Sequence, residues 1–385
     1  MEEVKAKVTT RSASMMDEDQ ESSSVGDLLI EALHNKAHQI LNLNYKGLLE
    51  FPHRLTRDDD YTHILVINAK RNLITSLPPD IHRLSGLHTL YLPSNKLSTL
   101  PDELCELKYL GSLDISQNAF SQIPPVVCRC ISLKRLFLSS NGLSSVPPEI
   151  GQLKELVLLN LMNNSLVTLP SEIGQCQSLE TLQLDRNRLQ SLPQQILALE
   201  QLEELSAVGN NFSWLPAGIG WLPRLSKLYV DHNPHLCAVP FNLYSKRVGV
   251  SNCGSSKPLL DRQIVQGELC GVLPPEIQTY FDAVHKTEHP SKLLEISLRI
   301  VYEYKDILDI NSLPRRLASL IEFPTSHCNG PVCCDQPIFT QAYVHLFQIP
   351  WVQDYALGGN SNVSLMALCC SRKCLQTLKR HPIPT

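Results

Sequence analysis

The sequence lacks three features that would each point to a broad class of protein. It has no run of about 18 apolar residues, which a membrane-spanning helix would need. Residues 1–27 carry Ser, Thr and charged side chains but no apolar core segment, so they do not resemble a secretory signal. Basic and acidic side chains nearly balance, 34 against 38, so no overall field favours nucleic acid or an anionic membrane as a partner.

Motifs typical of several enzyme classes are also missing. The phosphate-binding pattern GxxxxGK[ST], the dinucleotide-binding GxGxxG, the metalloprotease HExxH and the hydrolase GxSxG do not occur. The few basic residues near the C-terminal end are too sparse for a nucleic-acid-binding surface. We therefore expect a protein without catalytic activity.

What is present is a repeat with a constant period of 23 residues. It is marked by eight asparagines, Asn72, Asn95, Asn118, Asn141, Asn164, Asn187, Asn210 and Asn233. Around each of them the frame LxxLxLxxNxLxxLP recurs, and a degenerate ninth unit with Lys46 in place of its asparagine precedes them. Such self-similarity is the signature of a solenoid. We predict an α/β solenoid with a curved parallel sheet over residues 28–250, after a disordered N-terminal segment, 1–27.

The residue types of the frame suggest what each position does. The leucines should point inward and form one continuous core, because a single unit cannot bury its own apolar face. The asparagine amide can both donate to and accept from backbone groups of adjacent turns. The Leu-Pro pair favours an extended, helix-poor path on the convex side, since proline disfavours helix just before it.

This frame resembles the short intracellular leucine-rich repeats that end in LPxxIxxL, found in Ras-pathway scaffolds and plant Ras-group proteins. The resemblance implies a protein-binding module whose partner lies on the concave face. Residues between the inward leucines should line that face, because strand side chains alternate. The candidate contacts are Tyr91, Arg135, Phe137, Leu158, Met162, Asp185 and Tyr229. Phe137, Leu158 and Met162 form an apolar group suited to anchoring a partner, whereas the alternative is that all are ordinary solvated positions.

The repeat stops after Pro240, and residues 251–289 are predicted to be a linker or cap. Residues 290–322 then predict two amphipathic helices, the second beginning near Pro314. This pair resembles a SOCS box, in which one helix binds elongin and a following LPxxL segment recruits a cullin. The resemblance assigns these roles to Leu293, Ile296, Ser297, Val301, Leu313, Pro314 and Leu317, with Ser297 in a position where the family has cysteine. The alternative is a helical pair that packs on the end of the solenoid.

The last segment, residues 323–385, holds six of the 13 cysteines in two groups, CNGPVCC and LCCSRKC, about 35 residues apart. Two such groups separated by a β-like stretch are the layout of a structural zinc site, and Cys328, Cys333, Cys370 and Cys374 are the candidate ligands. Reduced core cysteines and disulfides are the alternatives. The odd cysteine count and the scattered single cysteines of the repeats favour reduced thiols in the cytoplasm or nucleus.

The repeats together with LPRRLASLIEFPTSHCNGPVCCDQPIF and LCCSRKC resemble an intracellular family of leucine-rich repeat proteins with a SOCS-box-like, Cys-rich C-terminal region. Two functions follow as hypotheses. The chain is either a substrate receptor of a cullin–elongin ubiquitin ligase or a signalling scaffold without a ligase.

Overall fold

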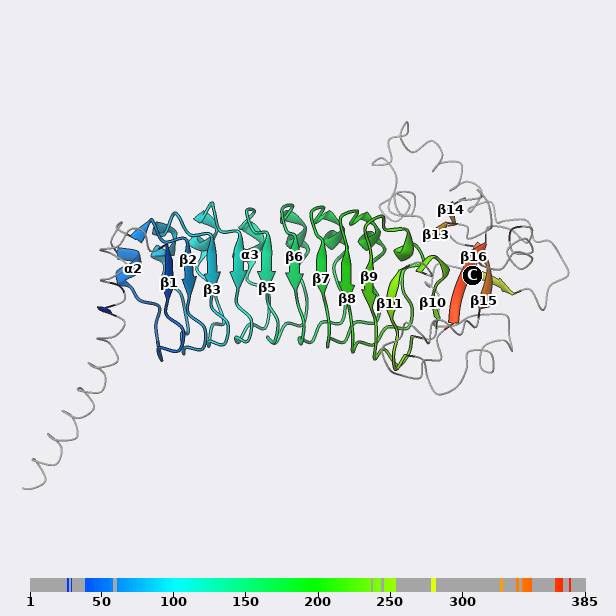
Figure 1. Ribbon diagram of the computed structural model, residues 1–385, viewed down its shortest axis with the longest axis horizontal. Helices are drawn as coiled ribbons and strands as arrows, with labels where there is room; N and C mark the ends of the chain where they lie inside the picture. Colours follow the sequence, from blue (N-terminus) through cyan, green and yellow to red (C-terminus); the bar gives the residue numbers. More distant parts are fainter. Residues whose placement is uncertain are drawn as a thin grey trace, which may run out of the picture. The chain divides into compact units, whose positions relative to one another are not determined.

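The computed structural model describes residues 39–57, 61–236, 238–243 and 246–253 (Figure 1). It also describes Gly26, Asp27, Leu29, Cys374 and five short strands in the C-terminal part. The chain divides into two compact units, with the boundary between Asn164 and Ser165. The SOCS-box-like segment, residues 290–322, and the candidate zinc ligands Cys328, Cys333 and Cys370 lie outside the described residues.

The first unit contains six parallel strands that pair in chain order, one per repeat. They are β1 (Ile40–Asn42), β2 (Val66–Asn68), β3 (Thr89–Tyr91), β4 (Ser112–Asp114), β5 (Arg135–Phe137) and β6 (Leu158–Asn160). Its short helices are α2 (Arg54–Arg57), η2 (Pro79–Arg83), η3 (Asp102–Glu106), α3 (Pro125–Arg129) and η4 (Pro148–Gln152). From β2 onward paired residues are 23 apart, so the register is the sequence period itself.

The second unit continues the same pattern with four parallel strands, β7 (Thr181–Gln183), β8 (Glu204–Ser206), β9 (Lys227–Tyr229) and β11 (Arg247–Gly249). Its helices are η5 (Ser171–Gln175), η6 (Gln194–Ala198), η7 (Ile219–Trp221) and η8 (Phe241–Leu243). A separate sheet has the order β10 (Ala238–Pro240), β16 (Ser364–Cys369), β15 (Gln341–Phe347), β12 (Gln278–Phe281). Strands β13 (Ser326–His327) and β14 (Pro337–Ile338) pair antiparallel.

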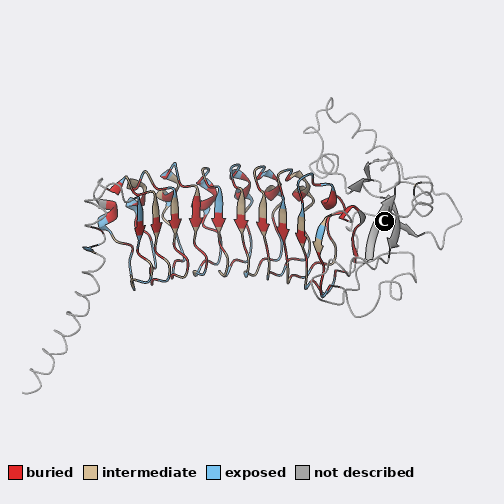
Figure 2. Ribbon diagram, in the orientation of Figure 1, coloured by how far each residue is buried: buried red, intermediate tan, exposed pale blue. Residues whose placement is uncertain are grey.

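The leucines of the frame form the core of each unit, as the pattern predicts, except that Leu100 is only half-buried. In one repeat Leu87, Leu90, Leu92 and Leu97 are all fully buried, and the equivalent leucines of the other repeats are buried in the same way. In Figure 2 buried residues recur in the strands of successive coils. Each buried leucine contributes about 1.5–3 kcal/mol of hydrophobic stabilisation, so the regular spacing of leucines accounts for most of the folding drive.

The asparagines form the hydrogen-bonded ladder that the sequence predicts. Nδ2 of Asn95 donates to the carbonyl of Ala69 in the preceding repeat (2.9 Å) and to that of Leu92 in its own (3.0 Å). Its Oδ1 accepts from the backbone N–H of Ile74 (3.2 Å). The pattern recurs at Asn118, Asn141, Asn164, Asn210 and Asn233. One side chain per repeat therefore satisfies three backbone groups.

A second recurrent feature was not visible in the sequence. The residue before each ladder asparagine has a positive φ: Arg71, Ser94, Gln117, Ser140, Asn163, Arg186 and His232 at 53° to 58°, and Gly209 at 67°. A left-handed backbone costs a non-glycine residue about 1 kcal/mol or more. Only one of the eight positions is glycine, so the bonds of the asparagine that follows offset this cost.

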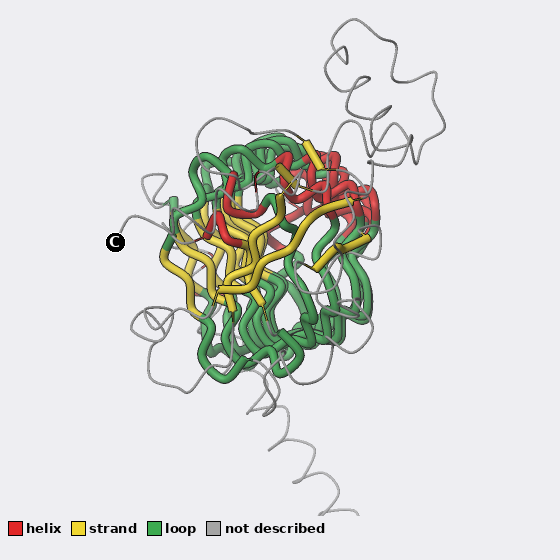
Figure 3. Tube along the Cα trace, turned by 90° about the vertical axis from the view of Figure 1, so that its right-hand side faces the viewer, coloured by secondary structure: helices red, strands yellow, loops and turns green. Residues whose placement is uncertain are grey.

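The prediction of a helix-poor convex side was wrong in part. The backbone is extended at five of these prolines, as at Pro101 with φ −69° and ψ 148°, but a turn of 3₁₀-helix begins at the next residue of each. Pro124 instead precedes the short α-helix α3. Proline disfavours helix for the residue before it and is compatible with the start of a helix, so the Leu-Pro pair sets where the helix begins. Seen end on, strands occupy one side of the coils and these short helices another (Figure 3).

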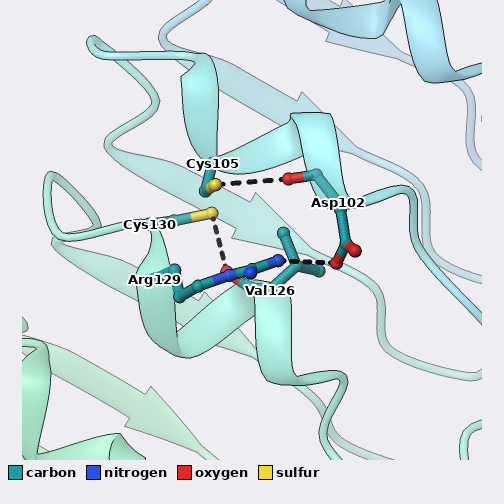
Figure 4. A network of polar contacts seen from close by, with 5 residues as sticks. All are labelled: Asp102, Cys105, Val126, Arg129 and Cys130. Atoms are coloured by element: carbon teal, nitrogen blue, oxygen red, sulfur yellow. Dashed lines mark hydrogen bonds and ion pairs between the residues drawn. The ribbon is translucent and has the colours of Figure 1, made fainter.

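Three cysteines of the repeats, Cys128, Cys130 and Cys176, are buried. Cys105 is only half-buried. Figure 4 shows the Cys130 Sγ donating to the carbonyl of Val126 (3.3 Å) and the Cys105 Sγ to that of Asp102 (3.2 Å). Such thiols act as packing groups with a weak donor.

Candidate binding surface

The side of the sheet that faces away from the core is the strand face, the surface that the sequence analysis treats as concave. Its residues are the first and third of each strand, and their neighbours follow from the register. In the first unit one row across the strands runs Tyr91, Asp114, Phe137, Asn160. A second row runs Thr89, Ser112, Arg135, Leu158. Five of the seven predicted contact residues belong to this unit.

The apolar group predicted from the sequence is brought together. Phe137 is opposite Asn160, and Leu158 lies two residues before Asn160 on the same face, so Phe137 and Leu158 are diagonal neighbours. Met162 lies two residues after Asn160, where the ladder continues through the bond from Ser140 N to Met162 O (2.9 Å). All three side chains are half-buried. We call Phe137, Leu158 and Met162 the apolar cluster.

Polar groups border this cluster. Asp114 lies between Tyr91 and Phe137, and burial raises the pKa of its carboxyl while the backbone N–H of Ser116 (2.9 Å) opposes that shift. Burial, followed by the nearby Asp114 carboxylate, raises the pKa of Tyr91. Tyr91 therefore keeps its phenolic proton at neutral pH and can donate a hydrogen bond to a partner.

The two predicted contact residues of the second unit have different surroundings. The Asp185 carboxylate accepts hydrogen bonds from Ser206 Oγ (2.6 Å) and from the backbone N–H of Val208 (2.8 Å), so it ties one repeat to the next. Tyr229 stands opposite Gly249, where a Cβ atom would lie 2.3 Å from the Asp231 carboxylate and 3.1 Å from the Tyr229 ring. Glycine at that position leaves room for both side chains.

One hollow on the surface of the first unit was not predicted from the sequence. Lys108, Tyr109, Gly111 and Lys134 lie beside a hollow of about 700 Å³ at the start of strands β3 to β5. The sequence held a signal for it. In register with Gly111, the flanking repeats carry His88, Lys134 and Val157, so the missing side chain breaks the pattern. The glycine stands out when equivalent positions of the repeats are compared, but it lies just before a strand and is therefore absent from a list of strand residues.

The predicted zinc site falls largely outside the described residues. Of the four candidate zinc ligands only Cys374 is described, as a half-buried residue. Across the described residues, no group of three or more His, Cys, Asp or Glu side chains is placed to hold a metal ion. Among those same residues, no helix has the length and apolar character needed to cross a membrane.

Comparisons with known proteins agree with the repeat. A family model described as a leucine-rich repeat region matches residues 148–239, and another described as leucine rich repeat matches residues 85–143. A solved leucine-rich repeat protein of Leptospira interrogans is 26% identical, with a TM-score of 0.50, over 60% of this chain and 71% of that one.

The leucine-rich repeat ectodomain of a membrane receptor kinase of Arabidopsis thaliana, solved in complex with CASPARIAN STRIP INTEGRITY FACTOR 2, is 27% identical. It has a TM-score of 0.44, and the match spans 51% of this chain and 28% of that one. The matched family models fall within the 23-residue coils, on residues that include buried leucines and most of the asparagine ladder. The chain is a leucine-rich repeat protein.

Proposed function

We propose that this chain is a non-enzymatic scaffold that holds a protein partner on its strand face. Leucine-rich repeat proteins are in general non-catalytic binding modules, which supports this class of function. The apolar cluster carries the proposal: Phe137, Leu158 and Met162 are half-buried and surround Asn160 on a face whose other positions are mostly polar. An aromatic ring and a methionine on such a face are typical anchors for a partner.

The experiment compares the proteins that the intact chain and a double variant capture from cells, quantified by mass spectrometry. Phe137→Ala with Leu158→Ala removes two anchors and leaves the buried leucines in place, so we expect specific partners to fall about tenfold or more. Thr99→Ala with Ser145→Ala is the matched control, because both residues are exposed, equivalent in the repeat and away from the strands. Equal capture by all three proteins rules out the strand face as the binding surface.

We further propose that the C-terminal part connects the bound partner to a cullin–elongin ubiquitin ligase, as the SOCS-box-like segment implies. The chain would then be a substrate receptor, with Leu293, Ile296 and Val301 on elongin and the Leu313–Pro314 pair on a cullin. The support is the order and spacing of the two half-motifs, which fit helix-in-groove recognition. The alternative proposal is a signalling scaffold of the Ras-pathway type without a ligase.

A pull-down separates these two proposals. The intact chain and a Leu293→Asp, Leu313→Asp variant are probed for elongin and for cullin. Recovery by the intact chain and loss in the variant supports the ligase link, since charge on the apolar helical face prevents docking. Recovery of neither protein by the intact chain leaves the scaffold proposal standing.

The Cys-rich tail is proposed to bind one structural zinc ion through Cys328, Cys333, Cys370 and Cys374. The support is the thiolate-rich spacing, since tetrahedral thiolate sites stabilise segments with small cores. This use of thiols fits a reducing compartment, so we propose that the protein acts in the cytoplasm or nucleus. Metal analysis of the purified chain and of a Cys328→Ser, Cys370→Ser variant tests the site. A zinc content well below one equivalent in the intact chain, and the same content in the variant, would contradict the zinc proposal.

A further inference from the structure

The hollow in the first unit, which we call the rim hollow, is built by four consecutive repeats. Lys108, Tyr109 and Gly111 of one repeat line it, with Lys134, Arg135 and Glu155 from the following repeats. The first residues of β3, β4 and β5 also line it, so it opens at the N-terminal ends of the strands. It lies beside the apolar cluster, because Arg135 is opposite Leu158 in the sheet register.

Gly111 creates the space. The equivalent positions of the neighbouring repeats carry the side chains of His88 and Lys134. A Cβ atom at Gly111 would meet only three carbonyl oxygens, at 3.9 to 4.0 Å, and Gly111 is not among the residues with positive φ. A Cβ atom therefore fits at this position without a clash, and glycine there leaves an opening that a ligand can fill.

One wall of the rim hollow is aromatic and rigid. The Tyr109 ring stacks on the His88 ring, with centroids 5.6 Å apart and planes 9° apart. His88 Nδ1 is 2.6 Å from the carbonyl of Gly86, which fixes that ring. Tyr109 is nonetheless 63% exposed, and Ile131, directly before the lining residue Ser132, is 67% exposed. Two large side chains on adjacent repeats, Tyr109 in the lining and Ile131 next to a lining residue in the sequence, are thus exposed, as expected of a contact surface.

The charged residues that line the rim hollow carry a net positive charge. Lys108, Lys134 and Arg135 line it together with a single carboxylate, Glu155. Within the part of the chain that the structure describes, none of these three cations forms an ion pair, whereas Lys227 pairs with Glu204 (2.9 Å). The whole chain carries a net charge of −4, so the positive charge of the rim hollow is opposite in sign to that of the chain.

We infer that the rim hollow binds an acidic segment of a partner protein, with a carboxylate near Lys134 and Arg135 and an adjacent apolar side chain near Tyr109. An arginine beside an open hollow suits a carboxylate, because the guanidinium can donate two parallel hydrogen bonds. Long polyanions such as nucleic acid are disfavoured by the small number of cations and by the negative net charge. The inference rests on the proposed function, since it describes one part of the same partner's contact with the strand face.

The test uses the full chain and a fluorescein-labelled peptide of alternating Glu and Leu, with fluorescence anisotropy as the readout. The matched probe replaces every Glu by Gln. We expect the Glu peptide to bind at least about tenfold more tightly than the Gln peptide. The affinity of the Glu peptide should fall as the salt concentration rises from about 0.05 to 0.3 M, because exposed charge pairs are screened.

Two variants address the rim hollow by different means. Lys134→Gln with Arg135→Gln removes two cations, and Gly111→Leu fills the opening without changing the charge. Each variant should bind the Glu peptide about tenfold more weakly than the intact chain does. Lys96→Gln with Arg188→Gln is the matched control, because both residues are exposed and directly follow a ladder asparagine at the other end of the strands. Unchanged circular dichroism and urea midpoints confirm that the variants fold.

Equal binding of the Glu and Gln peptides, or full binding by both rim-hollow variants, overturns the inference. So does displacement of the peptide by inorganic phosphate or by a single-stranded oligonucleotide at lower concentration than by unlabelled peptide, since either would mark a general anion site. A different result would contradict the proposed function. In that case Phe137→Ala with Leu158→Ala captures the same proteins as the intact chain, whatever the peptide does.

Discussion

At the scale of single residues, the ladder asparagines do the work that hydrogen bonds within a helix do elsewhere. Each coil of the solenoid leaves backbone groups pointing inward where no strand or helix partner is available, and a buried orphan group costs about 1–3 kcal/mol. A side-chain amide is suited to this position, because it supplies donors and an acceptor from one planar group. Aspartate would supply only the acceptors, and leucine would supply neither donors nor an acceptor.

We expect Asn210→Ala to lower the free energy of unfolding by about 2–4 kcal/mol, because three backbone groups lose their partner. Asn210 Nδ2 donates to the carbonyls of Leu184 (3.0 Å) and Ala207 (3.1 Å), and its Oδ1 accepts from Leu189 N–H (3.0 Å). The neighbouring Asn211 is exposed, so Asn211→Ala should change stability by less than about 0.5 kcal/mol. Urea unfolding followed by circular dichroism measures both, and similar values would contradict the ladder's role.

The buried thiols predict a pH dependence. Burial raises the pKa of Cys128 to about 11 and that of Cys130 to about 12, from 9.0. The folded state thus holds these protons more tightly than the unfolded state, so the thiols' contribution to stability is complete below pH 9 and declines as pH rises toward 11 or 12. The stability difference between the intact chain and Cys130→Ala should shrink by about 1–2 kcal/mol between pH 7.5 and 10.5.

Urea unfolding at the two pH values measures this difference, and the cavity left by alanine cancels because it is the same at both. A difference that stays constant with pH would show that the Cys130 thiol ionises equally in the folded and unfolded chain.

At the scale of elements, the strand and its register follow from the sequence, while the path of the convex side does not. A period of 23 residues with one buried leucine at each strand centre leaves a single register, because a shift by one residue would turn the leucines outward. The short helices after each proline depend on how adjacent coils approach one another. Glycines in those helices lie where adjacent coils are close together.

Two glycines of the second unit should respond differently to alanine. In η5, a Cβ on Gly174 would lie 2.3 Å from the backbone oxygen of Gln195, so the next coil must move. Gly209 has a φ of 67° and no atom nearer than 3.7 Å to its Cβ position, so alanine there meets only the left-handed backbone cost. Gly174→Ala should cost about 2–3 kcal/mol and Gly209→Ala about 1 kcal/mol. Thermal unfolding of both variants tests the order, and the reverse order would contradict this account.

At the scale of the whole molecule, the proposals assign two jobs to separate parts of the chain: the strand face holds a partner and the C-terminal segment recruits a ligase. Separate sites predict separable losses, because substitutions that share no contacts act independently. Phe137→Ala with Leu158→Ala should lose the captured partner about tenfold and keep elongin. Leu293→Asp with Leu313→Asp should do the opposite in the same pull-down, and joint loss in either variant would contradict two independent sites.

The sequence by itself determined the repeat, the buried leucines, the asparagine ladder and the pairing register, because all of these follow from a period that each coil shares with its neighbours. It also picked out Phe137, Leu158 and Met162, since strand alternation places them on one face. Only the tertiary structure decided three other features: the left-handed residue before each asparagine, the closeness of the coils at Gly174, and the rim hollow over Gly111. These depend on side chains or backbone from successive coils meeting in space, and a period read along one chain carries no measure of the distance between them.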